Sequence, residues 1–198
     1  MLLIGLVTRD TIILLRGDDM SKKIYSKEIV LNAALELAKV TGFDRLSIRG
    51  IARKLNISPS PVYDSFDSKK DIVEAIIVKV LDENSSIETY FERNLGILNF
   101  GLKHPILYND IKVYTRQFQI ETTHIEDIRA LMHLEPKLQH LDDRILNSYN
   151  FDILLYISGL IQLRLSDVTN EIDIDYYHSS LEAFSELLLI GYKNIPEG

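Results

Sequence analysis

The 198-residue sequence has no cysteine, only five prolines and only nine glycines. The absence of cysteine excludes disulfides, thiolate metal sites, iron–sulfur clusters and cysteine nucleophiles. The low proline and glycine content excludes a low-complexity linker protein. Apolar residues make up 46% of the chain, which is enough to bury the core of one compact domain or of two small ones.

Long apolar runs are also missing. The longest runs near the start, residues 2–7 and 11–15, are split by Arg9 and Asp10, and none approaches the roughly 18 residues of a membrane helix. We therefore expect a soluble, cytoplasmic protein without membrane contact. The chain has no G-x-S-x-G, G-x-G-x-x-G or Walker motif, and its five histidines lack metal-ligand spacing. We expect no enzyme, no metal and no cofactor.

Charge is distributed unevenly along the chain, whose net charge is −7. Residues 20–80 carry 11 Lys and Arg against 7 Asp and Glu, a balance of +4, whereas residues 81–198 carry 9 against 19, a balance of −10. A basic module ahead of an acidic one is typical of a DNA-binding domain joined to a domain with another role. A chance excess of cations on a solvated face is the alternative.

Apolar residues recur three and four positions apart after residue 24, which predicts an all-α chain. The expected helices span residues 26–40, 48–55, 58–66, 68–83, 86–102, 106–119, 122–134, 137–147, 149–165 and 174–192. Gly42 is expected to stop the first helix, Ser47 to cap the second, and Asn56 to take a left-handed conformation after it. The helix over 68–83 is apolar almost all round, so it must be covered on several sides and is the expected link between two domains.

Residues 1–19 do not fit this helical pattern. Codons for residues 16–20 can form a purine-rich ribosome-binding sequence ahead of an ATG, so we expect residues 1–19 to be a translated leader or a disordered arm, with Met20 as the start. A signal peptide is disfavoured, because the segment lacks a basic start and a small-residue cleavage site.

Two short helices joined by a tight turn, 47–55 and 58–66, form a candidate helix-turn-helix, whose second helix would enter the DNA major groove. Ile57 is expected to fill the turn, and Val62 and Phe66 to anchor the second helix on the core. An ordinary helical hairpin of an all-α protein would show the same pattern.

At these positions the sequence resembles the tetracycline-repressor (TetR) family of bacterial transcriptional regulators. The resemblance covers about residues 24–82 and rests on Ile29, Ala33, Ala34, Leu37, Gly42, Phe43, Leu46, Ser47, Ile48, Arg49, Ile51, Ala52, Leu55, Asn56, Ile57, Ser58, Val62, Tyr63, Phe66, Lys69 and Ile72. It implies a homodimeric repressor that binds a palindromic operator and is released by a small-molecule effector. It also implies an N-terminal three-helix DNA-binding domain over 20–67, a connecting helix over 68–84, and a helical ligand-binding and dimerisation domain over 85–198.

The resemblance assigns DNA contacts residue by residue. Ser47, Tyr63 and Lys69 match positions that contact phosphates, and Arg49 would belong to the same electrostatic surface. An arm near the minor groove would carry Lys22 and Lys23. The remaining DNA-binding candidates are Ser58, Pro59, Ser60 and Pro61, at the start of the recognition helix.

The recognition helix departs from the family pattern. Ser60 stands where Gly is common, Pro61 where Thr or Ser is usual, and Ser65 where His or Tyr is usual. We expect Ser60 to read bases, Pro59 or Pro61 to contact thymine methyls, and Pro61 to push Ser60 away from the α region, which would distort the first turn. These departures keep open a TetR-like protein that does not bind operators and acts through protein contacts as a coactivator or scaffold.

The last two helices have broad apolar faces, which in the family meet a second copy as a four-helix interface. The expected interface residues are Phe151, Leu155, Gly159, Gln162, Tyr177, Leu181, Phe184 and Leu188. The alternative is that these faces only fill the core of one chain.

The effector pocket is weakly encoded, because an aromatic stripe at helical spacing is more often core than a binding site. The expected pocket residues are Phe100, His104, Tyr108, Tyr114, Phe118, Tyr149, Tyr156 and Arg164. The acidic surplus and the aromatics would suit a lipophilic or cationic compound. Gly96 and Gly101 would loosen the helix before Pro105, where a ligand could act on the 68–83 helix.

Overall fold

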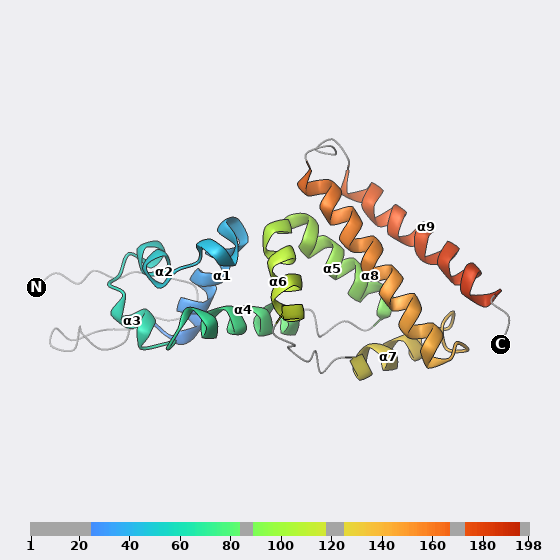
Figure 1. The fold of residues 1–198 in the computed structure, drawn as a ribbon, viewed down its shortest axis with the longest axis horizontal. Helices are drawn as coiled ribbons and strands as arrows, with labels where there is room; N and C mark the ends of the chain where they lie inside the picture. The colour runs from blue at the N-terminus through green and yellow to red at the C-terminus, as the bar shows by residue number, and fades with distance from the viewer. Residues whose placement is uncertain (1–24, 84–88, 118–124, 167–172, 195–198) are drawn as a thin grey trace, which may run out of the picture.

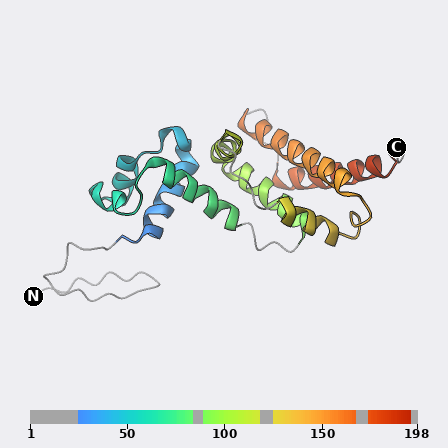
Figure 2. The same cartoon turned by 60° about the horizontal axis from the view of Figure 1, so that its bottom comes forward.

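The computed structural model describes residues 25–83, 89–117, 125–166 and 173–194. The helices are α1 Lys27–Arg45, α2 Ile48–Leu55, α3 Ser60–Tyr63, α4 Lys69–Glu83, α5 Tyr90–Lys103, α6 Pro105–Gln117, α7 Ile125–Leu134, α8 Asp143–Leu165 and α9 Ile174–Lys193. The all-α prediction is confirmed. The molecule is elongated, with α1 to α4 at one end and α8 and α9 at the other (Figures 1 and 2). None of the described helices is both long and apolar enough to cross a membrane.

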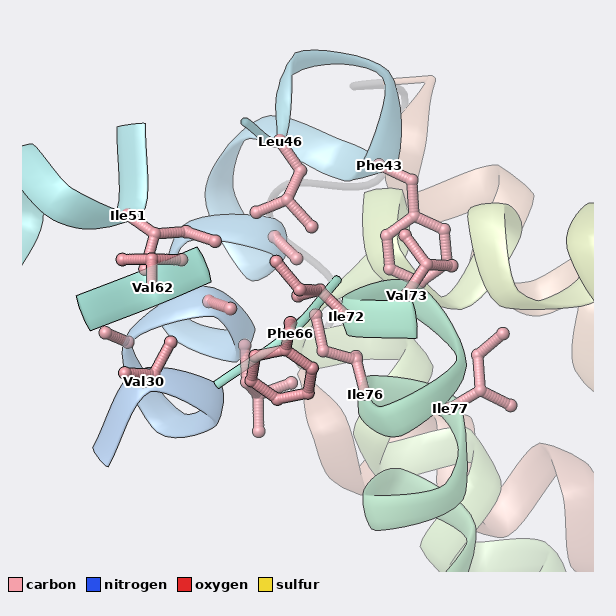
Figure 3. Close-up of a cluster of buried hydrophobic side chains, with 14 of the residues drawn as sticks. Val30, Phe43, Leu46, Ile51, Val62, Phe66, Ile72, Val73, Ile76 and Ile77 are labelled. Atoms are coloured by element: carbon pink, nitrogen blue, oxygen red, sulfur yellow. The ribbon is translucent and has the colours of Figure 1, made fainter. Parts of the chain in front are cut away.

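One hydrophobic core holds α1 to α4 together (Figure 3). Val30 of α1, Ile51 of α2 and Val62 of α3 are all 0% exposed, so the three short elements share one interior. Burial of an aliphatic side chain of this size contributes about 1.5–3 kcal/mol, which explains why a four-residue helix such as α3 holds its place. From α4, Ile72 and Ile76 complete the interior.

A second core joins α5, α7, α8 and α9. Gly101 of α5 lies so close to α8 that a Cβ atom there would sit 2.1 Å from Ile161 Cδ1. Helix α5 runs unbroken over Tyr90–Lys103, and Gly101 lets α5 and α8 pack closely. The expected loosening of this helix by Gly96 and Gly101 stays a prediction.

Helix α6 touches both cores. Leu107 is 0% exposed in the core of α1 to α4. The next residue, Tyr108, packs against the second core, and its hydroxyl lies 3.0 Å from Ser158 Oγ of α8. Because residues 107 and 108 point to different faces of the helix, α6 bridges the two cores.

Gly42 breaks α1 with φ 72° and ψ 174°, a region that is essentially restricted to glycine. The predicted stop at Gly42 is therefore a kink, after which the chain makes one more helical turn to Arg45. The kink frees the amide of Phe43, which donates a hydrogen bond to Asp110 Oδ2 of α6 at 2.6 Å. This bond ties the kink of α1 to the bridging helix.

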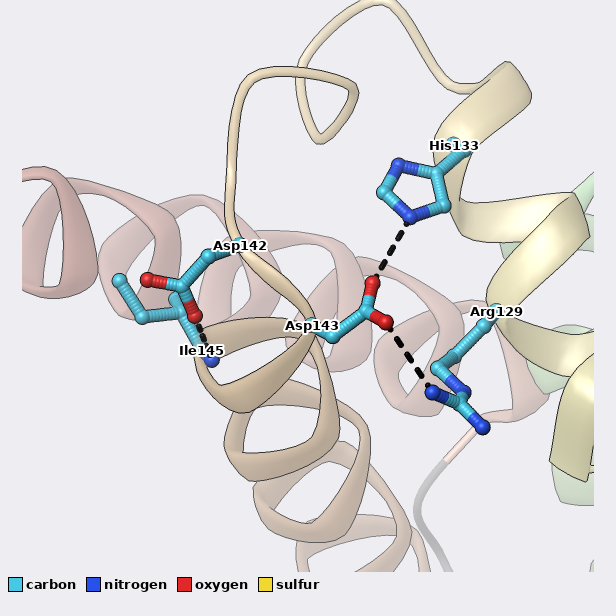
Figure 4. A network of polar contacts seen from close by, with 5 residues as sticks. All are labelled: Arg129, His133, Asp142, Asp143 and Ile145. Atoms are coloured by element: carbon cyan, nitrogen blue, oxygen red, sulfur yellow. Dashed lines mark hydrogen bonds and ion pairs between the residues drawn. The ribbon is translucent and has the colours of Figure 1, made fainter.

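The prediction of separate helices over 137–147 and 149–165 is wrong. Residues 136–140 form turns, and one continuous helix, α8, begins at Asp143. The Asp142 side chain caps it by accepting from the Ile145 amide at 2.8 Å. Asp143 accepts from Arg129 Nη1 at 3.1 Å and lies 3.1 Å from His133 Nε2, so this carboxylate fixes α7 against the start of α8 (Figure 4). The hydrogen bonds from His133 and Arg129 hold the pKa of Asp143 below its ordinary value.

Several expectations lie outside the described residues. These are the leader or arm over 1–19, the candidates Lys22, Lys23 and Phe118, and the helix boundaries expected at 86, 119 and 122.

Substituting Gly42 by alanine should lower the free energy of unfolding by about 2 kcal/mol, because φ 72° is strained for any Cβ-bearing residue. The new Cβ would also lie 2.6 Å from Asp110 Oδ2. Chemical denaturation measures the change. In the control Gly191→Ala the Cβ meets nothing within 4 Å, so stability should stay level or rise by up to about 1 kcal/mol. Equal effects of both substitutions would contradict this account.

Candidate functional site

The turn between α2 and α3 is built as the sequence predicted. Ser47 caps α2 by accepting from the Gly50 amide at 3.1 Å. Asn56 follows α2 in the left-handed conformation, with φ 55° and ψ 45°. There the Ile57 amide donates to Ala52 O at 3.0 Å, which closes the helix end and turns the chain toward α3.

Helix α3 begins at Ser60, not at Ser58, and Pro59 occupies the N-cap position without a side-chain capping hydrogen bond. The prediction that Pro61 distorts the first turn is wrong: Ser60 is helical, and its carbonyl accepts from the Asp64 amide at 2.9 Å. Pro61 lies in the first turn, where an amide has no partner within the helix, so its missing N–H costs no hydrogen bond. Ser65 Oγ donates to Pro61 O at 3.0 Å and extends the turn.

The described DNA-binding candidates lie at the start of α2, within α2, in the turn before α3, on α3 and at the start of α4. In Figure 1, α2 and α3 are at the end of the molecule farthest from α9. Ser47, Arg49, Ser58, Pro59, Ser60, Tyr63 and Lys69 are exposed, and Pro61 is half-buried. Tyr63 is 56% exposed although it follows the fully buried Val62, so packing fixes α3 while the Tyr63 ring faces solvent.

Cations line this surface. A shallow hollow between α2 and α3 is bordered by Arg49 and Arg53 together with Ser58 and Pro59. Within the described residues, neither arginine makes an ion pair. Lys69 Nζ donates to Asp44 O at 3.1 Å, which positions an ammonium that has two further N–H donors. We name the exposed face of Ser47, Arg49, Arg53, residues 58–63 and Lys69 the basic face.

The predicted pocket residues are not brought together. Tyr114 packs edge-on against Phe43 in the first core, at 6.0 Å between ring centroids. Phe100 also packs against that core and stacks edge-on with His104, whose pKa is lowered by burial and by nearby lysines. Tyr108 and Arg164 line neither of the two hollows described next.

A partly open cavity of about 270 Å³ lies between α5, the turn at 135–138, α8 and α9. Of the predicted pocket residues, only Tyr149 lines it. Sequence reasoning missed the acidic members of its lining, which are Glu135, Glu182 and Glu186. No sequence signal marks them, because they come from a turn and a helix more than forty positions apart. We name this hollow the α5–α9 cavity.

A wider groove of about 690 Å³ runs between α8 and α9 and is lined by Tyr156, Phe184 and Leu188, among others. The Tyr156 and Phe184 rings stack at 4.0 Å between centroids. The predicted interface residues Phe151 and Leu155 are 65% and 61% exposed. Gly159 and Gln162 are also exposed.

Two of the predicted interface residues are buried inside the single chain. Tyr177 and Leu181 are 2% and 1% exposed within a single chain, so they belong to its core. The free apolar side of α9 instead carries Tyr176, Leu187 and Ile190, which are 59%, 69% and 59% exposed. Because α9 is apolar on two sides, periodicity alone could not tell which side faces inward.

Comparison with known proteins shows that part of the N-terminal region is similar to a known family. Residues 30–76 match the family described as bacterial regulatory proteins, tetR family. Over 56 residues, the chain is 38% identical to the class D tetracycline repressor of Escherichia coli and to the class H repressor of Photobacterium damsela subsp. piscicida. The match spans 28% of this chain and only 26% of either repressor.

Solved structures share the fold over most of the chain. A transcriptional regulator from Rhodococcus sp. Rha1 has a TM-score of 0.63 at 14% identity, over 87% of this chain and 100% of its own. A TetR from Streptomyces coelicolor has a TM-score of 0.60 at 17% identity, over 88% and 100%. A TetR variant from Acinetobacter baumannii AYE in complex with minocycline has a TM-score of 0.57 at 18% identity, over 88% and 99%.

These findings define a helix-turn-helix domain that is similar, over residues 30–76, to the bacterial regulatory proteins of the tetR family. Over the rest of the chain the likeness is one of fold alone.

The left-handed residue after α2 gives a test of the turn that positions α3. Asn56→Ala should lower the free energy of unfolding by about 1 kcal/mol, because an L-residue with a Cβ is disfavoured at φ 55°. Asn56→Gly should change it by only a few tenths of a kcal/mol. Chemical denaturation measures the free energy of unfolding of both variants, with Asn147→Ala on the exposed side of α8 as the control. A glycine variant as unstable as the alanine variant would show that side-chain contacts, not φ, matter at residue 56.

Proposed function

We propose that the protein is a ligand-responsive transcriptional regulator, a homodimeric repressor that binds a palindromic DNA operator through the basic face. The single observation that carries this proposal is the exposure of hydroxyl, guanidinium and ammonium groups together on one helix-turn-helix. Such groups bind phosphates, and α3 is placed to enter the major groove. The match of residues 30–76 to the tetR family of bacterial regulatory proteins favours a regulator over an enzyme.

Two features of α8 and α9 support a dimer. The exposed side of α8 and α9 carries large apolar residues that a monomer would leave in water, including Phe151, Leu155 and Leu187. At Gly159 a Cβ would meet nothing within 4 Å, so a partner helix has room to approach there. A second copy would place two basic faces on one duplex, as a palindrome requires.

A small-molecule effector would act through α6. This helix reaches the core of α1 to α4 through Leu107 and the second core through Tyr108. A ligand that fits one arrangement of α5, α6 and α8 better than another would change the spacing of the two basic faces. A TetR variant of this fold from Acinetobacter baumannii AYE is in complex with minocycline, which supports a small-molecule effector.

A second function is a coactivator or scaffold that has lost operator binding. The departures at Ser60, Pro61 and Ser65 favour it. The helical geometry of Ser60 and the exposure of Tyr63 and Lys69 favour DNA binding. A salt-dependent titration against the DNA upstream of the gene, with scrambled DNA as control, separates the two. Binding no tighter than to scrambled DNA, there and in a genome-wide pull-down, would contradict the repressor.

Removing one phosphate contact should weaken operator binding without changing its sequence preference. Lys69→Gln is expected to lower affinity about tenfold and to reduce the log–log salt slope by about 1. Tyr63→Phe should lower affinity less, since it removes a neutral hydrogen bond of about 1 kcal/mol.

The matched control for this titration is Lys70→Gln. Lys70 is also exposed, but it forms an ion pair with Glu74 at 3.7 Å along α4, so its loss should leave the salt slope unchanged. Equal losses for residues 69 and 70 would mean that only net charge matters.

Dimer formation can be tested at Leu155. Leu155→Glu would place a carboxylate in the α8–α9 interface, and we expect the dimer dissociation constant to rise about 100-fold or more. Analytical ultracentrifugation measures it. The control Val113→Glu makes the same kind of change at an α6 side chain that is 53% exposed and remote from this face. A Leu155→Glu protein that remains dimeric would refute the interface.

A further inference from the structure

The α5–α9 cavity combines an aromatic lining with acidic side chains. Tyr90, Phe91 and Tyr149 contribute three rings, and Ile153, Leu181 and Leu189 add aliphatic surface. The charged lining residues are Glu135, Lys137, Glu182 and Glu186. They give three carboxylates against one ammonium.

The one ammonium does not balance the acids. Lys137 Nζ is hydrogen-bonded to Glu186, and this bond raises the pKa of Lys137, with smaller contributions from Glu182 and Glu135. All three carboxylates therefore act on one cation, and two negative charges remain in excess. A second cation would be attracted to this place and an anion repelled.

The phenol groups of the cavity are engaged by the protein itself. Tyr90 Oη donates to Asn150 Oδ1 at 3.0 Å, and Tyr149 Oη donates to Ser185 O at 3.2 Å. Burial raises the pKa of Tyr149 to about 12 and raises the pKa of Tyr90 as well. Both rings thus stay neutral near pH 7 and offer π surface, to which a cation is attracted.

We propose that the α5–α9 cavity binds a small organic cation, a protonated amine with an aromatic or apolar body, whose ammonium faces Glu135 and Glu182 while its body packs against Tyr90 and Tyr149. The volume of about 270 Å³ suits one ring with a short chain rather than a large multi-ring compound. This assignment names the effector class, and its regulatory consequence rests on the proposed function. The binding of the cation in the cavity does not rest on the proposed function.

Three probes of matched shape and different charge test the assignment: 2-phenylethylamine, 2-phenylethanol and phenylacetate. The chain has no tryptophan, so Phe91→Trp provides a single fluorescent reporter at the cavity. At pH 7 the amine should bind about tenfold more tightly than the alcohol, and phenylacetate most weakly. Because Phe91 lines the cavity, the titrations are repeated by calorimetry on the unaltered full-length chain.

Substitution of the acidic lining residues tests which carboxylates cause the preference for the amine over the alcohol. Glu135→Gln and Glu182→Gln should each weaken amine binding about fivefold and leave alcohol binding unchanged. The control Asp173→Asn removes one negative charge at the start of α9, where the exposed side chain makes no capping hydrogen bond, and should have no effect. An alcohol that binds as tightly as the amine, or amine binding unchanged in both glutamine variants, would overturn the proposal.

The same preparations are also titrated with operator DNA. The operator-binding proposal and the cation-site proposal can then be contradicted independently of each other. Operator binding without a preference for the amine overturns the cation site alone. A preference for the amine without operator binding overturns the proposed regulator and leaves the cation site in place.

Discussion

The structure depends on the hydrogen bond between the Phe43 amide and Asp110 Oδ2, at 2.6 Å. The amide is available only because Gly42 leaves the helical conformation, and the carboxylate reaches it only because Gly42 has no side chain. A charge-assisted bond of this kind is about twice as strong as a neutral one. It fixes the end of α1, and hence the helix-turn-helix that follows, to α6. No other helix contact among the described residues is as extensive as that of α1 with α6.

Helix α6, which carries Asp110, connects this hydrogen bond to the second core. Its two faces belong to two different cores, through Leu107 on one side and Tyr108 on the other. Close-packed cores resist gradual deformation, so a rearrangement in one would move α6 as a body. In the proposed regulator, α6 with its Asp110 would be the route by which a rearrangement of the C-terminal helices reaches the basic face. Coupling of this kind requires only that a ligand fit one arrangement better than the other.

The recognition helix shows how packing overrides a local preference. A residue before proline is disfavoured in the α region, yet Ser60 is helical. Val62 and Phe66 are 0% and 4% exposed, and their burial fixes the path of the chain between them and α2. Pro61 itself removes only an amide that the first turn leaves unpaired. Two prolines can thus stand at the surface of a helix-turn-helix without destroying it.

The sequence by itself determined the all-α class, the cap at Ser47, the left-handed Asn56 and the break at Gly42, because these depend on neighbours within a few positions. Only the tertiary structure decided which side of α9 faces inward, that α8 is continuous, and that Glu135 and Glu182 meet at one cavity. Those outcomes depend on contacts between distant segments, and α9 has two apolar sides that local periodicity treats as equal. The predicted pocket residues were scattered for the same reason: an aromatic side chain fits a core as well as a ligand site, and only the packed neighbours distinguish the two.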